Sequence, residues 1–118
     1  MLGINFAFRV DASLQIGSGH VMRCLALADV LAARGAQCRF VCRDHAGHLA
    51  ETIRQRGYRV ELLSASGSRP PLVTPDGPVH AAWLGSDWGD DAPETARLLD
   101  RDRPDWLVVD HYALDSRW

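Results

Sequence analysis

The chain has 118 residues, which is enough for one domain with a buried core, and its 47% hydrophobic and 24% charged residues are typical of a soluble globular protein. The net charge of −2 gives no reason to expect nucleic acid or a membrane as a partner. No apolar run approaches the ~18 residues of a membrane-spanning helix, and the first residues lack a signal-peptide pattern. We therefore expect a cytoplasmic protein.

The first half of the chain alternates between strand-like and helix-like segments. Runs of β-branched and aromatic residues predict strands, and apolar residues spaced for one helical face and followed by a glycine predict helices. On these signals we expect a strand at 4–10, a loop at 11–19, a helix at 20–34, a strand at 37–43, a short helix at 47–56 and a strand at 58–63.

The second half of the chain is less regular. Its expected elements are a proline-rich loop at 64–80, an ambiguous stretch at 83–88, a helix from Asp90 or Asp91 to about 102, a strand at 105–110 and the first turns of a further helix at 112–118. Asp91 is the expected N-cap, followed by Pro93 in the first turn. We expect Cys24, Cys38 and Cys42, like the four tryptophans, to serve as packing residues.

This order of elements predicts one α/β domain over residues 1–118. Strands that alternate with helices form a Rossmann-like parallel sheet with right-handed crossovers and helices on both faces. Ligands bind such sheets outside the carboxyl ends of the strands. Three segments are expected at that edge: residues 11–23, 43–48 and 110–112.

A glycine turn, Gly17-Ser18-Gly19, lies between the first strand and the first helix. Glycines allow a close approach of the backbone to a ligand, and the helix start offers unpaired N–H groups that suit a phosphate. The dinucleotide fingerprint is a weaker alternative, because Met22 stands where its third glycine belongs.

His20 and Arg23 share one face at the start of that helix. The positive end of the helix dipole favours neutral imidazole, which is the form that a general base requires. The anion that neutralises Arg23 is either Asp11 or a ligand phosphate, and Asp11 is also the candidate carboxylate that orients His20. Asp110 ends a buried strand, where it is either a ligand contact or a helix N-cap.

Two histidines of the next loop, His45 and His48, present a possible metal site with Asp44 and Glu51. No third ligand has helical register with both histidines, so we expect a solvated loop instead. No cofactor and no metal site are predicted from the sequence.

Three motifs, the first of which has two segments, resemble those of a known family. The segments F-R-V-D-A-S and I-G-S-G-H-V-M-R-C-L-A-L-A, then D-A-x-x-T and D-W-L-V-V-D-H-Y, are similar in order and spacing to those of the UDP-sugar hydrolases of pseudaminic acid biosynthesis. The substrate of that family is UDP-2,4-diacetamido-2,4,6-trideoxy-β-L-altropyranose. The resemblance implies a GT-B fold, related to the N-acetylglucosaminyltransferase that acts on lipid II.

The resemblance also implies residue roles. His20 matches the proposed base that activates water, Tyr112 matches an active-site tyrosine, and Arg23 and Asp11 match the arginine and aspartate of the motifs. The implied reaction is hydrolysis at the anomeric carbon with inversion and without a metal. On this basis we expect His20, Asp11 and Tyr112 to be catalytic, and residues 17–19, Arg23 and Asp110 to bind substrate.

The family is more than twice as long as this chain, which corresponds to the N-terminal domain. We therefore expect a missing C-terminal domain to supply most nucleotide contacts, and the 118 residues alone to be inactive and to self-associate through exposed apolar surface. Two other functions stay open: a GT-B glycosyltransferase that uses the same histidine, and a non-catalytic sugar-nucleotide-binding half-domain.

Overall fold

The structure is a computed structural model that describes residues 3–65, 69–71 and 73–118. Its strands are β1 (Asn5–Val10), β2 (Gln37–Arg43), β3 (Arg59–Leu63) and β4 (Trp106–Asp110), and its helices are α1 (Gly19–Ala33), α2 (Ala50–Gln55), the 3-10 turn η1 (Ala81–Leu84) and α3 (Trp88–Leu99). The predicted loop at 64–80 lies partly outside the described residues. The four predicted strands and the first two predicted helices are confirmed to within a few residues.

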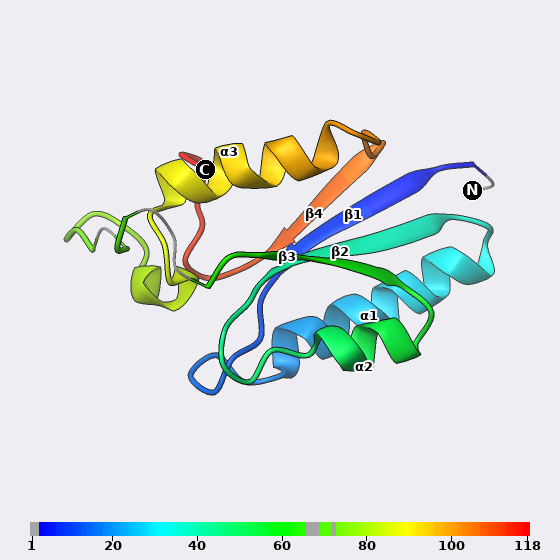
Figure 1. The fold of residues 1–118 in the computed structure, drawn as a ribbon, viewed down its shortest axis with the longest axis horizontal. Coiled ribbons are helices and arrows are strands. Elements are labelled where there is room, and N and C mark those ends of the chain that lie inside the picture. The colour runs from blue at the N-terminus through cyan, green and yellow to red at the C-terminus, as the bar shows by residue number, and fades with distance from the viewer. Residues whose placement is uncertain (1–2, 66–68, 72) are drawn as a thin grey trace.

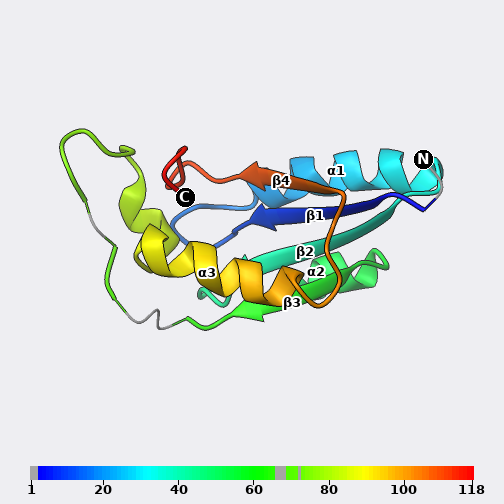
Figure 2. The ribbon, with the colours of Figure 1, turned by 90° about the horizontal axis from the view of Figure 1, so that it is seen from above.

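The strands form one parallel sheet in the order β3-β2-β1-β4. Figures 1 and 2 show α1 and α2 on one face of this sheet and α3 on the other. The predicted α/β, Rossmann-like fold is confirmed. The chain runs outward from β1 through β2 to β3 and then returns through α3 to β4 on the far side of β1. This reversal is a topological switch point, and it lies at the carboxyl ends of β1 and β4.

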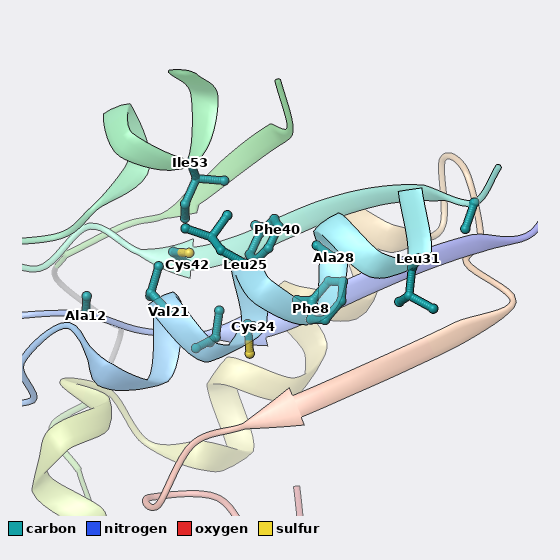
Figure 3. Packing of buried hydrophobic residues seen from close by; sticks show 12 residues of the cluster. Phe8, Ala12, Val21, Cys24, Leu25, Ala28, Leu31, Phe40, Cys42 and Ile53 are labelled. Carbon is teal, nitrogen blue, oxygen red and sulfur yellow. The ribbon is translucent and has the colours of Figure 1, made fainter. Parts of the chain in front are cut away.

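The larger hydrophobic core fills the space between the sheet and α1 (Figure 3). Leu25 and Ala28 of α1 pack over the aromatic pair of Phe8 in β1 and Phe40 in β2, whose ring centroids are 4.8 Å apart. Cys24 and Cys42 are buried in the same core, and all three cysteines are free, as predicted. This core fixes α1 against β1 and so fixes the position of the residues at the start of α1.

Three expectations for the second half of the chain are wrong. The N-cap of α3 is Asp87, whose carboxylate accepts a hydrogen bond from the Gly89 N–H at 2.6 Å, while Asp91 is completely buried one turn later. Residues 112–118 form turns instead of a helix. Trp106, expected to pack, is 64% exposed because β4 is an edge strand.

Candidate functional site

The candidate site lies at the switch point, where the start of α1 meets the end of β4. Residues of β4 face alternate sides of the sheet, and the register of β4 with β1 pairs Asp110 with Val10 and Val108 with Phe8. Val108 packs against the core under α1, so Asp110 projects to the same face. That face brings Asp110 to the first turn of α1, where His20 and Arg23 lie.

His20 and Asp110 form a hydrogen-bonded pair that we call the edge dyad. His20 Nδ1 lies 2.9 Å from Asp110 Oδ1, and the two side chains are 11% and 16% exposed. The Arg23 guanidinium, which only donates, also lies 3.2 Å from Nδ1, but the Asp110 contact is shorter, and because an ionised carboxylate only accepts hydrogen bonds we assign the proton to Nδ1. The lone pair of the neutral ring is therefore on Nε2, and no described residue hydrogen-bonds to that atom. A histidine in this state is able to accept a proton.

Arg23 donates to both oxygens of the same carboxylate in a bidentate arrangement and shares Oδ1 with His20. The Arg23 hydrogen bonds, together with the His20 contact, outweigh the effect of burial and lower the pKa of Asp110 to about 2. Asp110 is therefore the anion that neutralises Arg23. The expectation that Asp11 has this role is wrong. The positive charge of Arg23 is largely neutralised by Asp110 without any ligand.

Asp11 belongs instead to a separate group, the buried cluster of Arg9, Asp11, Arg43, Asp91 and His111. Arg9 follows a residue that faces α1 and so projects to the α3 face, and Asp11 continues the same alternation. The Asp11 carboxylate accepts hydrogen bonds from Arg9 at 2.7 Å, the Arg43 backbone N–H at 2.7 Å and His111 Nε2 at 2.8 Å. Within the described chain, no hydrogen bond joins Asp11 to His20. Asp11 therefore does not orient the proposed base.

Asp91 completes the buried cluster from α3. Its carboxylate accepts hydrogen bonds from Arg9 at 2.6 Å, Arg43 at 2.7 Å and Trp118 Nε1 at 2.9 Å. Burial opposes ionisation of Asp91 and Asp11, but the arginines and the hydrogen bonds outweigh it and hold the pKa of both carboxyls below the ordinary value. The cluster thus ties β1, β2 and α3 together through paired charges, although Arg43 Nε has no hydrogen-bond partner among the described residues.

His45 packs against the same cluster, contrary to the expected solvated loop. Its Nε2 lies 3.4 Å from Asp11 Oδ2, and a Cβ atom added to Gly85 would lie 2.6 Å from its ring. His48 instead pairs with Asp44 at 3.1 Å. The two histidines therefore point to different partners, and no group of three metal-ligating side chains occurs in the residues that the structure describes.

Tyr112 forms one wall of the site. Its ring meets His20 edge-on, with centroids 4.5 Å apart and an interplanar angle of 82°, and the residue is 52% exposed. Trp83 of η1 lies across from it, 6.3 Å away and nearly parallel. Together with Ile16, the edge dyad, and Asp11 and His111 from the interior, these rings line a pocket that is closed to a water molecule in this structure. The structure therefore brings His20, Arg23, Asp110 and Tyr112 together, as the sequence predicted for one sheet edge.

The glycine turn lies at the rim of this pocket. Gly17 has a φ of +81°, which favours glycine, and residues 17–19 are exposed. Ser18 is the N-cap of α1 but makes no capping bond through its side chain, and the first turn of α1 has no acidic residue. Backbone N–H groups at the start of α1 are therefore available to an anionic ligand.

Cys24 lies beside the edge dyad but does not have the properties of a nucleophile. Its sulfur is 3.6 Å from Asp110 Oδ2, and burial, together with that negative charge, raises its pKa to about 12. A thiol with this pKa is protonated at neutral pH and unreactive. Of the polar groups in the pocket, His20 is thus the one suited to proton transfer.

Sequence reasoning missed two features of the site. It assigned Asp110 to substrate binding without recognising it as the partner of His20, and it expected Trp83 only to pack and named no partner for His80. Knowledge that β4 pairs with β1 would have identified Asp110 as the partner of His20, because this pairing places the carboxyl end of β4 beside the start of α1. We find no sequence signal for the aromatic residues of η1.

No protein-family model matches the sequence, and no curated protein is significantly similar to it. The described helices include none that is long and apolar enough to cross a membrane. The geometry of the pocket and the motifs of the chain are therefore the observations that bear on its function.

Proposed function

We propose that this chain is the catalytic half of a UDP-sugar hydrolase, with His20 as general base. The observation that carries the proposal is the edge dyad: a histidine at the switch point whose Nδ1 is held by Asp110 and whose Nε2 is free of described partners. The motif resemblance to the hydrolases of pseudaminic acid biosynthesis supports the substrate, a UDP-linked diacetamido-trideoxy-altropyranose.

In the proposed reaction, His20 Nε2 takes a proton from water as the water oxygen forms a bond to the anomeric carbon. The bond between that carbon and the UDP oxygen breaks, and UDP leaves with the bonding electrons, so the anomeric configuration inverts. The imidazolium that forms is stabilised by the Asp110 carboxylate. The N–H groups at the start of α1 are positioned for the negative charge of the leaving diphosphate.

The proposal includes a second, C-terminal GT-B domain that supplies most of the nucleotide contacts. In this arrangement the 118 residues bind the sugar and carry the base but turn over poorly alone. We also expect UDP release to be insensitive to a metal chelator, because the proposed proton transfer needs no metal.

The direct test is to measure UDP release from the UDP-linked altropyranose, using the longest native reading frame that contains this chain. We expect release in water alone, and a fall in kcat of about 10²- to 10⁴-fold in His20→Asn, the range for loss of a general base. Equal release by His20→Asn would contradict the proposal. No release from either protein would favour a glycosyltransferase, for which acceptor sugars would then be tested, or a binding module.

A further inference from the structure

A groove of about 240 Å³ opens next to the pocket of the edge dyad. It lies between the loop after β1, the loop after β2 and η1, which Figure 1 shows gathered at one end of the sheet. Its walls come from residues 13–15, residues 45–46, Ala82, Trp83 and Gly85. Trp83 also lines the pocket of His20, so the groove and the pocket share one wall.

The groove is held open by close backbone packing. The Leu14 N–H donates to the Ala46 carbonyl at 3.0 Å, and a Cβ atom added to Gly47 would lie 2.9 Å from Leu14 N. On the other side, Gly85 has a φ of +72° and touches the ring of His45. Because glycines at 47 and 85 permit these contacts, the loops and η1 have a fixed spacing before any ligand binds.

Trp83 is fixed from behind by an aromatic stack. The His80 and Trp83 rings have centroids 4.0 Å apart and an interplanar angle of 17°, and Tyr112 lies nearly parallel to both. Across the groove, Leu14 is 85% exposed, which is unusual for a leucine at the edge of a polar site. The groove therefore presents two apolar surfaces next to a potential proton acceptor.

Building on the proposed function, we propose that Trp83 is a specificity-determining residue that stacks on the apolar face of the sugar ring of the substrate. The groove has a volume of about 240 Å³ and is open to solvent, which leaves room for a sugar ring, while the nucleotide is assigned to the proposed C-terminal domain. An aromatic wall with an apolar residue opposite it favours a deoxy-sugar over a fully hydroxylated one. A ring seated there has its anomeric carbon beside the edge dyad.

The test compares Trp83→Ala and Trp83→Phe in the full reading frame. Dissociation constants for the UDP-linked altropyranose and for UDP are measured in a His20→Asn background, where the sugar is not consumed. Trp106→Ala is the matched control, because Trp106 is an exposed tryptophan on β4 outside the groove. We expect Trp83→Ala to weaken the UDP-sugar about five- to tenfold, Trp83→Phe to recover most of this loss, and UDP itself to bind unchanged.

Because the proposed C-terminal domain supplies most of the nucleotide contacts, folding of the domain that carries Trp83 is checked separately, by thermal unfolding of Trp83→Ala beside Trp106→Ala. The inference is overturned if Trp83→Ala weakens UDP as much as the UDP-sugar, or if it weakens neither. The proposed function and this inference fail in different ways. If the wild-type protein binds the UDP-sugar through Trp83 but releases no UDP, the inference stands and the proposed hydrolase is wrong. If the protein releases UDP but Trp83→Ala does not weaken UDP-sugar binding, the hydrolase stands and the inference is wrong.

Discussion

The buried cluster and the edge dyad are both built from aspartate, arginine and histidine, and they lie on opposite faces of the same strand ends. In the buried cluster, Arg9, Arg43, Asp11 and Asp91 have side chains with no exposed surface, and both carboxylates have several donors. In the edge dyad, Asp110 is equally well bound, but the Arg23 side chain is 56% exposed and His20 keeps one ring nitrogen free of described partners.

This difference indicates that the edge dyad, and not the buried cluster, is the candidate for a chemical role. Buried charges that are paired with one another hold elements together, and removing one member leaves the others unpaired at a high cost. In the edge dyad, by contrast, Asp110 binds only Nδ1 of the partly exposed His20 ring, and this contact leaves the lone pair on Nε2 available to accept a proton. Chemical composition alone does not distinguish the two groups, whereas burial and the free Nε2 do.

The largest expected effect comes from breaking the buried cluster with Asp91→Asn. Arg9 and Arg43 would then lack half of their compensating charge while completely buried, so the free energy of unfolding should fall by about 3–5 kcal/mol. Urea unfolding of wild type and variant measures this. Glu94→Gln is the control, because Glu94 makes one partly exposed contact with Arg43 at 3.3 Å and should lose less than about 1 kcal/mol. Equal losses in both variants would contradict the assignment.

Asp110→Asn applies the same change to the edge dyad. An asparagine retains the shape but removes the charge that fixes the Nδ1 proton and stabilises the imidazolium, so we expect UDP release to fall about 10- to 100-fold. Stability should change little, because Arg23 is largely exposed. A variant that unfolds while its remaining folded fraction is fully active would show that Asp110 is structural.

Acid separates the two groups through their carboxyls. The folded-state pKa of Asp110 is about 2 against an ordinary 3.8, and those of Asp11 and Asp91 are also lowered. A lowered pKa gives stability that is complete above the unfolded value and is lost as the pH falls through the folded one. We expect the free energy of unfolding to drop below about pH 4, and most of this drop to persist in Asp110→Asn. Loss of the whole drop in that variant would contradict the account.

The smallest effect is expected from Arg23→Lys, for which Arg43→Lys is the buried comparison. Lysine cannot bind a carboxylate in the bidentate way that Arg23 binds Asp110, but exposed water replaces the lost donor, so stability should change by less than about 1 kcal/mol. Arg43 donates to Asp91 and to the Ser64 carbonyl inside the protein, and its replacement should cost about 1–3 kcal/mol. Thermal unfolding of both variants measures the two losses of stability. A larger loss in Arg23→Lys than in Arg43→Lys would contradict the distinction between the edge dyad and the buried cluster.

The sequence predicts the fold well because its local signals agree with one another. Apolar periodicity, β-branched runs and glycine stops locate β1, α1, β2 and β3 to within a few residues, and their alternation implies a parallel sheet. The α3 cap was misplaced because Asp87 and Asp91 have the same local capping propensity. Only the tertiary contacts with Arg9 and Arg43 decide that Asp91 is turned inward.

The site is predictable in part for a related reason. His20 and Arg23 share a helix face, so their proximity follows from spacing alone. The choice between Asp11 and Asp110 as the partner of His20 depends on strand order, because Asp110 is 90 residues away and reaches α1 only when β4 pairs with β1. Pairing between distant strands leaves no local trace in the sequence.

The central claim is that His20 and Asp110 act as one unit in UDP release. A double-mutant cycle of His20→Asn and Asp110→Asn tests it most directly, with kcat measured for all four proteins at matched folded concentration. Because residues that act as a unit are not additive, the account predicts that Asp110→Asn causes no further loss once His20 is absent. Losses that multiply, with the double variant slower than His20→Asn by the full factor of Asp110→Asn, would contradict it.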